Sequence, residues 1–539
     1  MTTEAVYLNQ FTTIVSSSAV TEETVYREPI QKHNSTQSIF TIFTVMKYAL
    51  FIAVFILQLS LIAQKDTAFI YTFGGEQDEQ GRDIEITSDN GFIMVGSTSS
   101  FGAGNSDIYL VKVDSNIKYE WSAAIGHEFT EFGHAVKQTA DNGYIICGYT
   151  NSIGNGSYDA YLVRIDDKGK LLWEKTFGGF DWDFAYDVEI TSDGGFLIVG
   201  ETHSLGNGNA DAYLIKTDKD GNLLWEKTMG GSGKDIAHAL ISTKDGNFAF
   251  CGENASKNPE NKGDAWLVKF DGNGDTLFSG YVLLPEFESA KGIVETVSNG
   301  YAIVGISYSE NIKTSDILTA SFTDKGEFEW FFYHGAVYAP QIENDEGYGI
   351  DIYQNGNLLI TGSSELGNGG DNVYSGMIRG NDGSYITAPS YGDSKNEAAF
   401  DCMILPKGGE AFLGTGESVS NGYSDMQLII VDTVDGNKTL VYSKIEDTIS
   451  TPVLNSTENN YAVNKTGVFP NPVINELFIQ SDEEIFKIDV FSVNRTHISV
   501  PIFIDSGLSK IDTRTLPRGL YFIKIEFNEQ VINRKFLKH

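Results

Sequence analysis

Short apolar runs, separated by glycine-rich or Asp-Gly turns, recur along most of the chain. In the copy at 176–227 the runs are DVEIT, FLIVGET, DAYLIKT and LLWEKTF, and the turns between them are SDGG, HSLGNGNA and DKDGN. Val, Ile, Tyr, Phe and Trp favour strands, and Asp-Gly or Gly-Gly supplies the positive φ of a tight hairpin turn. Each copy therefore predicts four antiparallel strands, which is the content of one propeller blade.

The copies can be counted on the glycine that closes the second run, which we call the anchor glycine. The anchors are Gly96, Gly148, Gly200, Gly252, Gly305 and Gly362, followed by either Gly414 or Gly416. The first four lie 52 residues apart, and a period near 50 residues is typical of propellers and other repeat folds. The sequence thus predicts an all-β protein whose main part, 65–445, is a seven-bladed β-propeller of four-stranded blades.

Two segments compete to complete the last blade. The stretch 68–75 matches the end of the other copies, so an N-terminal strand is expected to close the ring and remove its free sheet edges. The stretch 440–444 fits the same place in the pattern. The sequence does not decide between them.

Charge and cysteine content narrow the range of partners. The chain has 539 residues and a formal net charge of -35, which argues against nucleic acid or an anionic membrane surface as a partner. Cations or neutral polymers suit it better. Cys147 and Cys251 occupy the same position in non-adjacent copies, and Cys402 lies in an inner strand. Such positions are too far apart for a disulfide, so three buried, unpaired thiols are expected.

The N-terminal region has the features of an export signal. Residues 1–45 are polar and rich in Thr and Ser, and we expect them to be a non-native or disordered leader. Met46 and Lys47 precede sixteen mostly apolar residues, 48–63, which predicts a signal peptide at 46–64 with Met46 as the true start. An uncleaved signal anchor is the alternative. Cleavage after Ala63 would leave a mature form without an integral membrane span.

A different small domain follows a polar linker at 446–466. Its short alternating runs predict an Ig-like β-sandwich at 467–539. The run Phe469-Pro470-Asn471-Pro472, the strand at 477–479, the strand at 519–524 with Gly519 and Tyr521, and the basic end with Lys538 resemble the type A C-terminal sorting domain of type IX secretion substrates. The family often has a glycine where this chain has Asn494-Arg495.

The resemblance implies a cellular address. It implies recognition by the type IX secretion machinery, export across the outer membrane, removal of the sorting domain, and release or attachment to surface lipopolysaccharide. The repeats likewise resemble the TFGG/SDGG propeller repeats that such secreted proteins often carry. An ordinary terminal sandwich domain is the alternative for the tail.

Two acidic positions recur in every copy, and antiparallel geometry places both on one face of the propeller. Seventeen residues before the anchors stand Glu79, Glu131, Asp183, Asp235, Glu288, Asp345 and, for Gly414, Glu397; at the start of the third strands stand Asp107, Asp159, Asp211, Asp264, Asp316, Asp371 and Asp425. With nearby glycine-rich loops they form a candidate Ca²⁺ site. A residue that every blade needs is more typical of structural capping of turns and neighbouring blades, and both interpretations stay open.

A third position varies between copies, as expected of a single binding site. Fourteen residues before the anchors stand Arg82, His134, Tyr186, His238, Lys291 and Tyr348, and the loop FDWDF adds Phe180, Trp182 and Phe184. Aromatic rings beside carboxylates suit sugars, because the rings stack and the carboxylates bind hydroxyl groups. Packing between blades is the alternative.

No nucleophile elbow, P-loop, dinucleotide fingerprint, HExxH or CxxC motif is present. The sequence therefore favours a secreted or surface-displayed, non-enzymatic propeller that binds a glycan or a protein. A polysaccharide-active hydrolase or lyase that uses the acidic face is the second hypothesis. A passive structural surface protein is the third.

Overall fold

The computed structural model describes residues 67–538, except for 258–262, 310–312, 335–343, 366–369, 393–394, 407, 418–422, 432–438, 445–452, 455–466, 470–475, 481–484, 493–496, 505–507 and 527–530. All regular elements in these residues are β-strands. The expected leader and signal peptide lie outside the described residues, as does the expected linker apart from the short strand β31 (Val453–Leu454).

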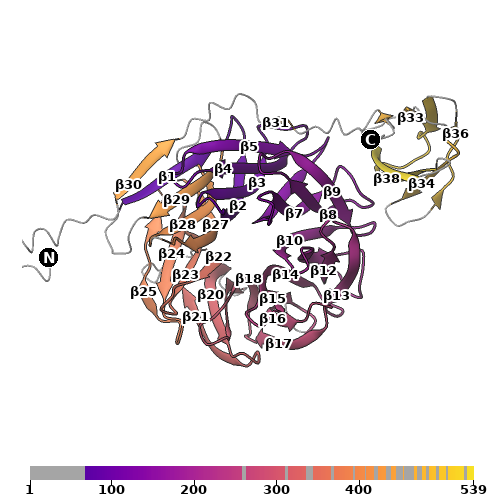
Figure 1. Cartoon of the computed structure of the whole chain (residues 1–539). Coiled ribbons are helices and arrows are strands. Elements are labelled where there is room, and N and C mark those ends of the chain that lie inside the picture. The colour runs from indigo at the N-terminus through magenta and orange to yellow at the C-terminus, as the bar shows by residue number, and fades with distance from the viewer. Residues whose placement is uncertain are drawn as a thin grey trace, which may run out of the picture. The chain divides into compact units, whose positions relative to one another are not determined.

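Each repeat forms its own sheet of antiparallel strands, which in the first six sheets follow chain order from the innermost to the outermost (Figure 1). The first sheet has β2 (Glu79–Ile86), β3 (Phe92–Thr98), β4 (Asp107–Val113) and β5 (Tyr119–Ile125), and the short β31 pairs parallel with β5 at its outer edge. The second has β6 (Glu131–Gln138), β7 (Tyr144–Thr150), β8 (Asp159–Ile165) and β9 (Leu171–Phe177). The third has β10 (Asp183–Ile190), β11 (Phe196–Thr202), β12 (Asp211–Thr217) and β13 (Leu223–Met229).

The later repeats continue the pattern. The fourth sheet has β14 (Asp235–Ser242), β15 (Phe248–Asn254), β16 (Asp264–Phe270) and β17 (Thr276–Val282). The fifth has β18 (Phe287–Glu295), β19 (Tyr301–Ser309), β20 (Thr314–Phe322) and β21 (Phe328–His334). The sixth has β22 (Asp345–Ile352), β23 (Leu358–Glu365) and β24 (Asp371–Ile378), with β25 (Tyr385–Thr387) and β26 (Ser390–Tyr391) both paired to β24.

The last sheet of the ring joins the two ends of the repeat region. Its strands are β27 (Glu397–Ile404), β28 (Glu410–Gly416), β29 (Asp425–Val431), β1 (Thr67–Phe73) and β30 (Thr439–Lys444), in that order. The N-terminal β1 pairs antiparallel with β29, which confirms that this strand completes the sheet. The competing segment is also used, because β30 pairs parallel with β1 on its outer side.

A β-bulge interrupts the pairing between the first two strands of every sheet in the ring. In the third sheet Ala185 pairs with Gly200 and Asp187 pairs with Val199, so Tyr186 has no partner across the ladder. The other sheets shift register at the corresponding place. A bulge bends the strand and redirects the side chain of its extra residue. In each repeat this is the variable residue fourteen positions before the anchor glycine.

The anchor glycine is needed because two backbones approach closely beside the bulge. A Cβ atom on Gly200 would lie 1.8 Å from the carbonyl oxygen of Phe184, so no larger residue fits. In the last sheet Ala399 pairs with Gly414 in the same register, which settles the choice between the two glycines in favour of Gly414.

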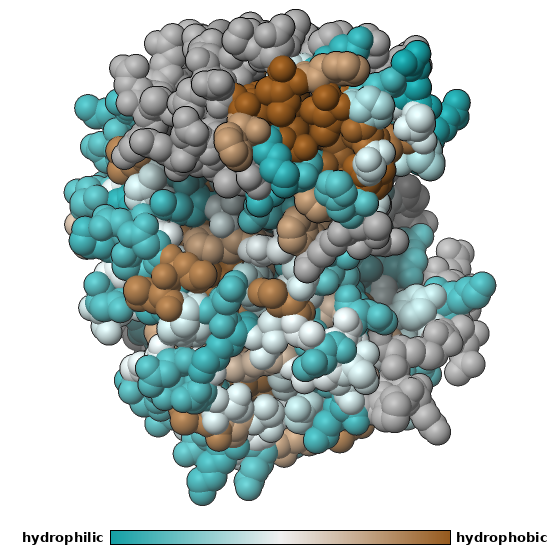
Figure 2. Space-filling view, turned by 90° about the vertical axis from the view of Figure 1, so that its right-hand side faces the viewer, coloured by the Kyte–Doolittle hydropathy of each residue, from teal (hydrophilic) through white to brown (hydrophobic). Residues whose placement is uncertain are grey.

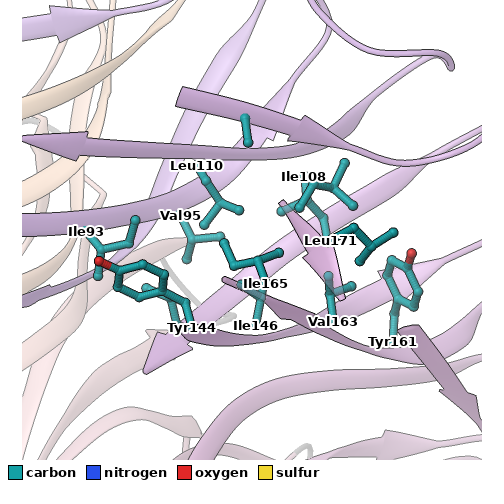
Figure 3. Close-up of a cluster of buried hydrophobic side chains, with 13 residues drawn as sticks. Ile93, Val95, Ile108, Leu110, Tyr144, Ile146, Tyr161, Val163, Ile165 and Leu171 are labelled. Atoms are coloured by element: carbon teal, nitrogen blue, oxygen red, sulfur yellow. The ribbon is translucent and has the colours of Figure 1, made fainter. Parts of the chain in front are cut away.

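The hydrophobic core lies between neighbouring sheets. Side chains of the first and second sheets form one cluster, with Ile93 and Val95 facing Ile146 and Val163 (Figure 3). Similar clusters join the second sheet to the third and so on around the ring, and one of them joins the last sheet to the first. Because every sheet is packed on both faces, the ring is closed, which is the arrangement of a β-propeller.

The outermost strands leave some apolar side chains in contact with solvent. Leu172, Leu223, Leu224 and Leu277 are between 46% and 56% exposed. One side of the molecule shows apolar patches separated by hydrophilic surface (Figure 2). The three cysteines, in contrast, are buried and free, as expected from their spacing.

The C-terminal part forms two further four-stranded sheets. One contains β32 (Gly467–Phe469), β33 (Glu476–Gln480), β37 (Leu508–Asp512) and β36 (Ile502–Phe503); the other contains β35 (His497–Ile498), β34 (Lys487–Ser492), β38 (Gly519–Glu526) and β39 (Val531–Lys538). Side chains of both sheets share one core, which includes Leu477, Ile511 and Ile523. Tyr521 is buried and its hydroxyl donates to the Pro517 carbonyl at 2.8 Å. Pro470, Asn471 and Pro472 of the motif lie outside the described residues.

Candidate functional site

The first set of repeated acids lies at the starts of the innermost strands, fully or almost fully buried. Glu131 accepts hydrogen bonds from the His127 backbone N–H at 2.7 Å and from the Thr150 hydroxyl at 2.5 Å. A loop N–H and a hydroxyl are also the donors in the first, third and fourth repeats. In these four repeats the carboxylate therefore holds the loop that leads into its sheet.

The second set performs a similar task within the glycine-rich loops. Asp211 accepts the backbone N–H groups of Asn207 and Gly208, both at 3.0 Å. The loops of both sets meet on one face, where short parallel bridges join Tyr158 to Trp182 and Ala210 to Lys234. The acids that directly follow the bridged residues therefore lie on the same face.

The calcium hypothesis has no added support from this geometry. Among the residues that the structure describes, no group of three or more His, Cys, Asp or Glu side chains is placed to hold a metal ion. Most of the second set is buried, but Asp371 is half-buried and Asp316 is exposed. Calcium binding at these acids stays a prediction.

The bulge residues of the innermost strands form what we call the inner ring. Its members are Arg82, His134, Tyr186, His238, Lys291, Tyr348 and Phe400, all on strands that face the axis of Figure 1. Several neighbouring members contact each other: the ring centroids of His134 and Tyr186 are 5.1 Å apart, and those of Tyr186 and His238 are 5.3 Å apart. The structure thus brings the variable residues together.

Burial changes the protonation of the basic members of the inner ring. Burial, with the nearby Arg82 charge, lowers the pKa of His134 to about 3. Burial also lowers the pKa of His238, and it lowers the pKa of Lys291 to about 8. Lys291 Nζ lies 2.8 Å from His238 Nε2, so the neutral imidazole can accept a hydrogen bond from the ammonium group.

Aromatic side chains extend from the inner ring onto the loop face between the second and fourth sheets. We call this set the aromatic cluster; its rings lie 5.0–6.4 Å from their neighbours and belong to Phe132, His134, Tyr149, Tyr158, Trp182, Phe184, Tyr186, His203 and His238. Trp182 is 48% exposed, and the adjoining Phe180 is 41% exposed. The predicted aromatic loop therefore lies at the solvent edge of the predicted inner residues.

Carboxylates that the sequence reasoning missed lie beside the aromatic cluster. Glu201 and Glu253 directly follow the anchor glycines of the third and fourth repeats and are buried. Glu201 Oε1 lies 3.6 Å from His203 Nε2, and its Oε2 has no hydrogen-bond partner among the described residues. Burial raises the pKa of Glu253. Tyr149 also directly follows an anchor glycine. The position after the anchor glycine is therefore the sequence feature by which these residues could have been found.

The carboxylates directly below the inner ring bind backbone N–H groups of neighbouring sheets. Asp83 Oδ2 accepts the Val136 N–H at 2.7 Å, and Asp187 Oδ2 accepts the Leu240 N–H at 2.7 Å. Each bond crosses from one innermost strand to the next. Lys137 lies among these acids, and although burial opposes it, their charges raise its pKa above the ordinary range. This layer joins the sheets, so the candidate site ends at the inner ring.

Comparisons with known proteins identify the tail. Residues 467–539 match the family described as the secretion system C-terminal sorting domain. A regulatory protein of Caulobacter vibrioides, FlaEY, is 27% identical over 198 residues, which are 32% of this chain and 20% of that protein. The chain therefore spans about one fifth of the length of this curated relative.

Two solved structures resemble the repeat region only loosely. A Dyadobacter fermentans protein of unknown function has 11% identity and a TM-score of 0.38, and the match covers 68% of this chain and 98% of that one. The periplasmic gluconolactonase of Pseudomonas aeruginosa has 10% identity and a TM-score of 0.39, and the match covers 63% and 96% of the two chains.

The sorting domain indicates where the protein is located. No helix in the described part of the chain is long and apolar enough to cross a membrane. The type IX sorting domain at 467–539 indicates interaction with the type IX secretion machinery, and the protein is exported by that route and is secreted or attached to the cell surface.

Proposed function

We propose that this exported protein is a non-enzymatic β-propeller that binds a glycan at the aromatic cluster. The supporting observation is one continuous set of aromatic rings that begins at exposed Trp182 and reaches the inner ring at Tyr186. Sugars bind aromatic faces through their C–H groups and bind carboxylates through their hydroxyls. Both kinds of group meet here, because Glu201 borders the same rings.

The proposal includes a finer statement of the fold. The sheets at 67–444 are the blades of a seven-bladed propeller, and the two sheets at 467–538 are an Ig-like sandwich. The supporting facts are the closed sequence of packed sheets and the shared core of the tail sheets. A propeller displays loops of several blades around one axis, so one ligand can touch several repeats.

A glycan array followed by titration calorimetry with the full chain tests the function. We expect Trp182→Ala to weaken the binding of any array hit at least tenfold, because stacking against an exposed indole is lost. Thr130→Ala is the matched control, since Thr130 occupies the corresponding bridge position in the preceding repeat. Equal affinity of wild type and Trp182→Ala, or an array without hits, would contradict the proposal.

One observation favours a polysaccharide-active enzyme as the second candidate. Glu253 has a raised pKa and Lys291 has a pKa of about 8 through burial, and their charges act on each other. A lysine that titrates near neutral pH, beside a carboxylate, is suited to proton transfer. Under this hypothesis the chain would release new reducing ends from a bound polysaccharide, and Lys291→Met would abolish the release without abolishing binding.

A further inference from the structure

Arg82 is a cation that has no counter-ion among the described residues of this strongly acidic protein. Its Cζ lies 4.0 Å from the centre of the Phe400 ring and 5.1 Å from that of Phe132. Its Nη2 donates to Gln80 Oε1 at 3.0 Å, and its Nε is buried without a hydrogen-bond partner among the described residues.

Two other arginines of the chain form ion pairs with aspartates. Arg164 lies 2.5 Å from Asp141, and Arg514 lies 2.6 Å from Asp512. Arg82 forms no ion pair with any residue that the structure describes, although the chain has 73 acidic residues and 38 basic ones. Arg379 likewise has no ion pair among the described residues, but it is exposed to solvent, whereas Nε of Arg82 is buried.

The surroundings of Arg82 make the missing partner costly. Burial lowers its pKa, and the groups whose charges act on it are the tyrosines Tyr348 and Tyr149. Its own charge helps to lower the pKa of His134. A desolvated cation without an ion partner is unfavourable. A ligand that supplied an anion would remove this penalty and gain binding energy.

The shape of the site limits which anion fits. Two phenyl rings pack against the guanidinium group, so its N–H edge is the part left for a ligand. A guanidinium edge binds a planar carboxylate through two parallel hydrogen bonds. Phe132 also belongs to the aromatic cluster, and its ring centroid lies 5.5 Å from that of Tyr149. One oligosaccharide could therefore place an anionic group at Arg82 and a sugar ring on the aromatic cluster.

We propose that Arg82 binds the carboxylate of a uronic acid residue in the glycan held by the aromatic cluster. This inference rests on the proposed function and names the substrate class. The neutral side chain His134 and the aromatic rings beside Arg82 exclude water around the pair, which strengthens the ionic hydrogen bonds. A neutral glycan would leave the guanidinium unpaired.

The test compares two matched trisaccharides by titration calorimetry with the full chain. Trigalacturonic acid carries the carboxylates, and galactotriose is its neutral counterpart. We expect wild type to prefer the acid about tenfold or more, as a charged bidentate pair allows. Arg82→Gln should abolish this preference and keep galactotriose binding, while Arg379→Gln, which removes an exposed charge outside the inner ring, should keep the preference.

Each result decides the inference. Equal affinity of wild type for both sugars, or a preference that survives in Arg82→Gln, would overturn it and leave the proposed function intact. Equally tight binding of a sulfated galactotriose would overturn the assignment of a carboxylate. If neither sugar binds to wild type, this inference fails, and the glycan array decides separately on the proposed function. Should Arg82→Gln not fold, Arg82→Lys replaces it. Lysine keeps the charge but lacks the two parallel N–H groups of the guanidinium, so this variant should reduce the preference for the acidic sugar several-fold. An unchanged preference would count against the inference.

Discussion

Glu131 and Glu288 occupy the same position in the second and fifth repeats, yet their surroundings differ. Both are fully buried. Glu131 accepts hydrogen bonds from the His127 N–H and the Thr150 hydroxyl at 2.7 and 2.5 Å. Glu288 accepts one from the Ser307 hydroxyl at 3.3 Å, and its Oε2 is buried without a hydrogen-bond partner among the described residues.

The difference comes from the loop that precedes each acid. In the first four repeats this loop supplies the N–H donor four residues before the acid. Before Glu288 the sequence is LLPEF, and among the described residues the N–H of Leu284, four residues before the acid, makes no hydrogen bond to its carboxylate. Burial, with the charge of Asp264, raises the pKa of Glu288 to about 8. A residue conserved in type between repeats can therefore stabilise one sheet junction and strain another.

Removing the satisfied acid should have the largest effect. We expect Glu131→Ala to lower the free energy of unfolding by about 3 kcal/mol, because two buried donors lose their acceptor. Urea unfolding of the full chain at pH 7 measures the loss. Glu131→Gln keeps an acceptor oxygen and should lose less than half as much. A loss below about 0.5 kcal/mol in Glu131→Ala would contradict the stabilising role of this acid.

Neutralising the unsatisfied acid should have the opposite sign. The pKa of Glu288 is about 8 in the folded chain against an ordinary 4.5, so its contribution to stability is present below pH 4.5 and is lost as the pH rises through 8. We expect Glu288→Gln to raise the free energy of unfolding by roughly 2 kcal/mol at pH 8.5, with the gain falling towards zero at pH 4.5.

A control separates this effect from a general change in charge. Glu295 lies on the same strand, is half-buried and accepts the Lys244 N–H at 2.8 Å. Glu295→Gln should therefore show no gain that grows with pH. If both variants gained equally, long-range charge rather than the burial of Glu288 would be the cause.

Much of the fold could be predicted because the same pattern of turns and apolar runs recurs in each repeat. The turns and apolar runs located the strands of each sheet, but the innermost strands begin earlier than their apolar pattern indicated. The run DVEIT starts at Asp187, whereas β10 starts at Asp183. The bulge at Tyr186 breaks the alternation of inward and outward side chains, so the first half of the strand does not look like a strand in the sequence.

The site could be predicted only in part, for two physical reasons. Phe400 was missed because the last anchor glycine was ambiguous until the pairing of Gly414 resolved it. Glu201 and Tyr149 were missed because they follow anchor glycines inside apolar runs, which are typical of core positions. The sequence did not decide which segment closes the ring, because two segments fit the last sheet. The structure uses both of them.

The closing junction is the other place where one copy departs from the rest. In the outer hairpin turns of the second to fifth repeats a glycine has a positive φ of 76° to 80°. In the first repeat the corresponding residue is Ile117, with φ 60°. Ile117 and Phe69 of the closing strand line a cavity of about 350 Å³. At the corresponding turn of the second repeat a side chain would have no room, because a Cβ on Gly169 would lie 2.9 Å from Trp121.

The smallest expected effect is the relief of this turn. A β-branched residue is disfavoured in the left-handed region, whereas asparagine tolerates it, and this chain already has Asn90, Asn142 and Asn299 there at φ 62° to 65°. We expect Ile117→Asn to raise the free energy of unfolding by about 1 kcal/mol, since the gain in backbone energy exceeds the loss of partly buried apolar contact. The reciprocal change Asn142→Ile should lower it by about 1 kcal/mol. Urea unfolding of both variants measures the pair. If Ile117→Asn were destabilising while Asn142→Ile behaved as expected, packing of Ile117 at the closing junction would outweigh its backbone strain, and this departure from the repeat would be stabilising in the way that Glu288 is not.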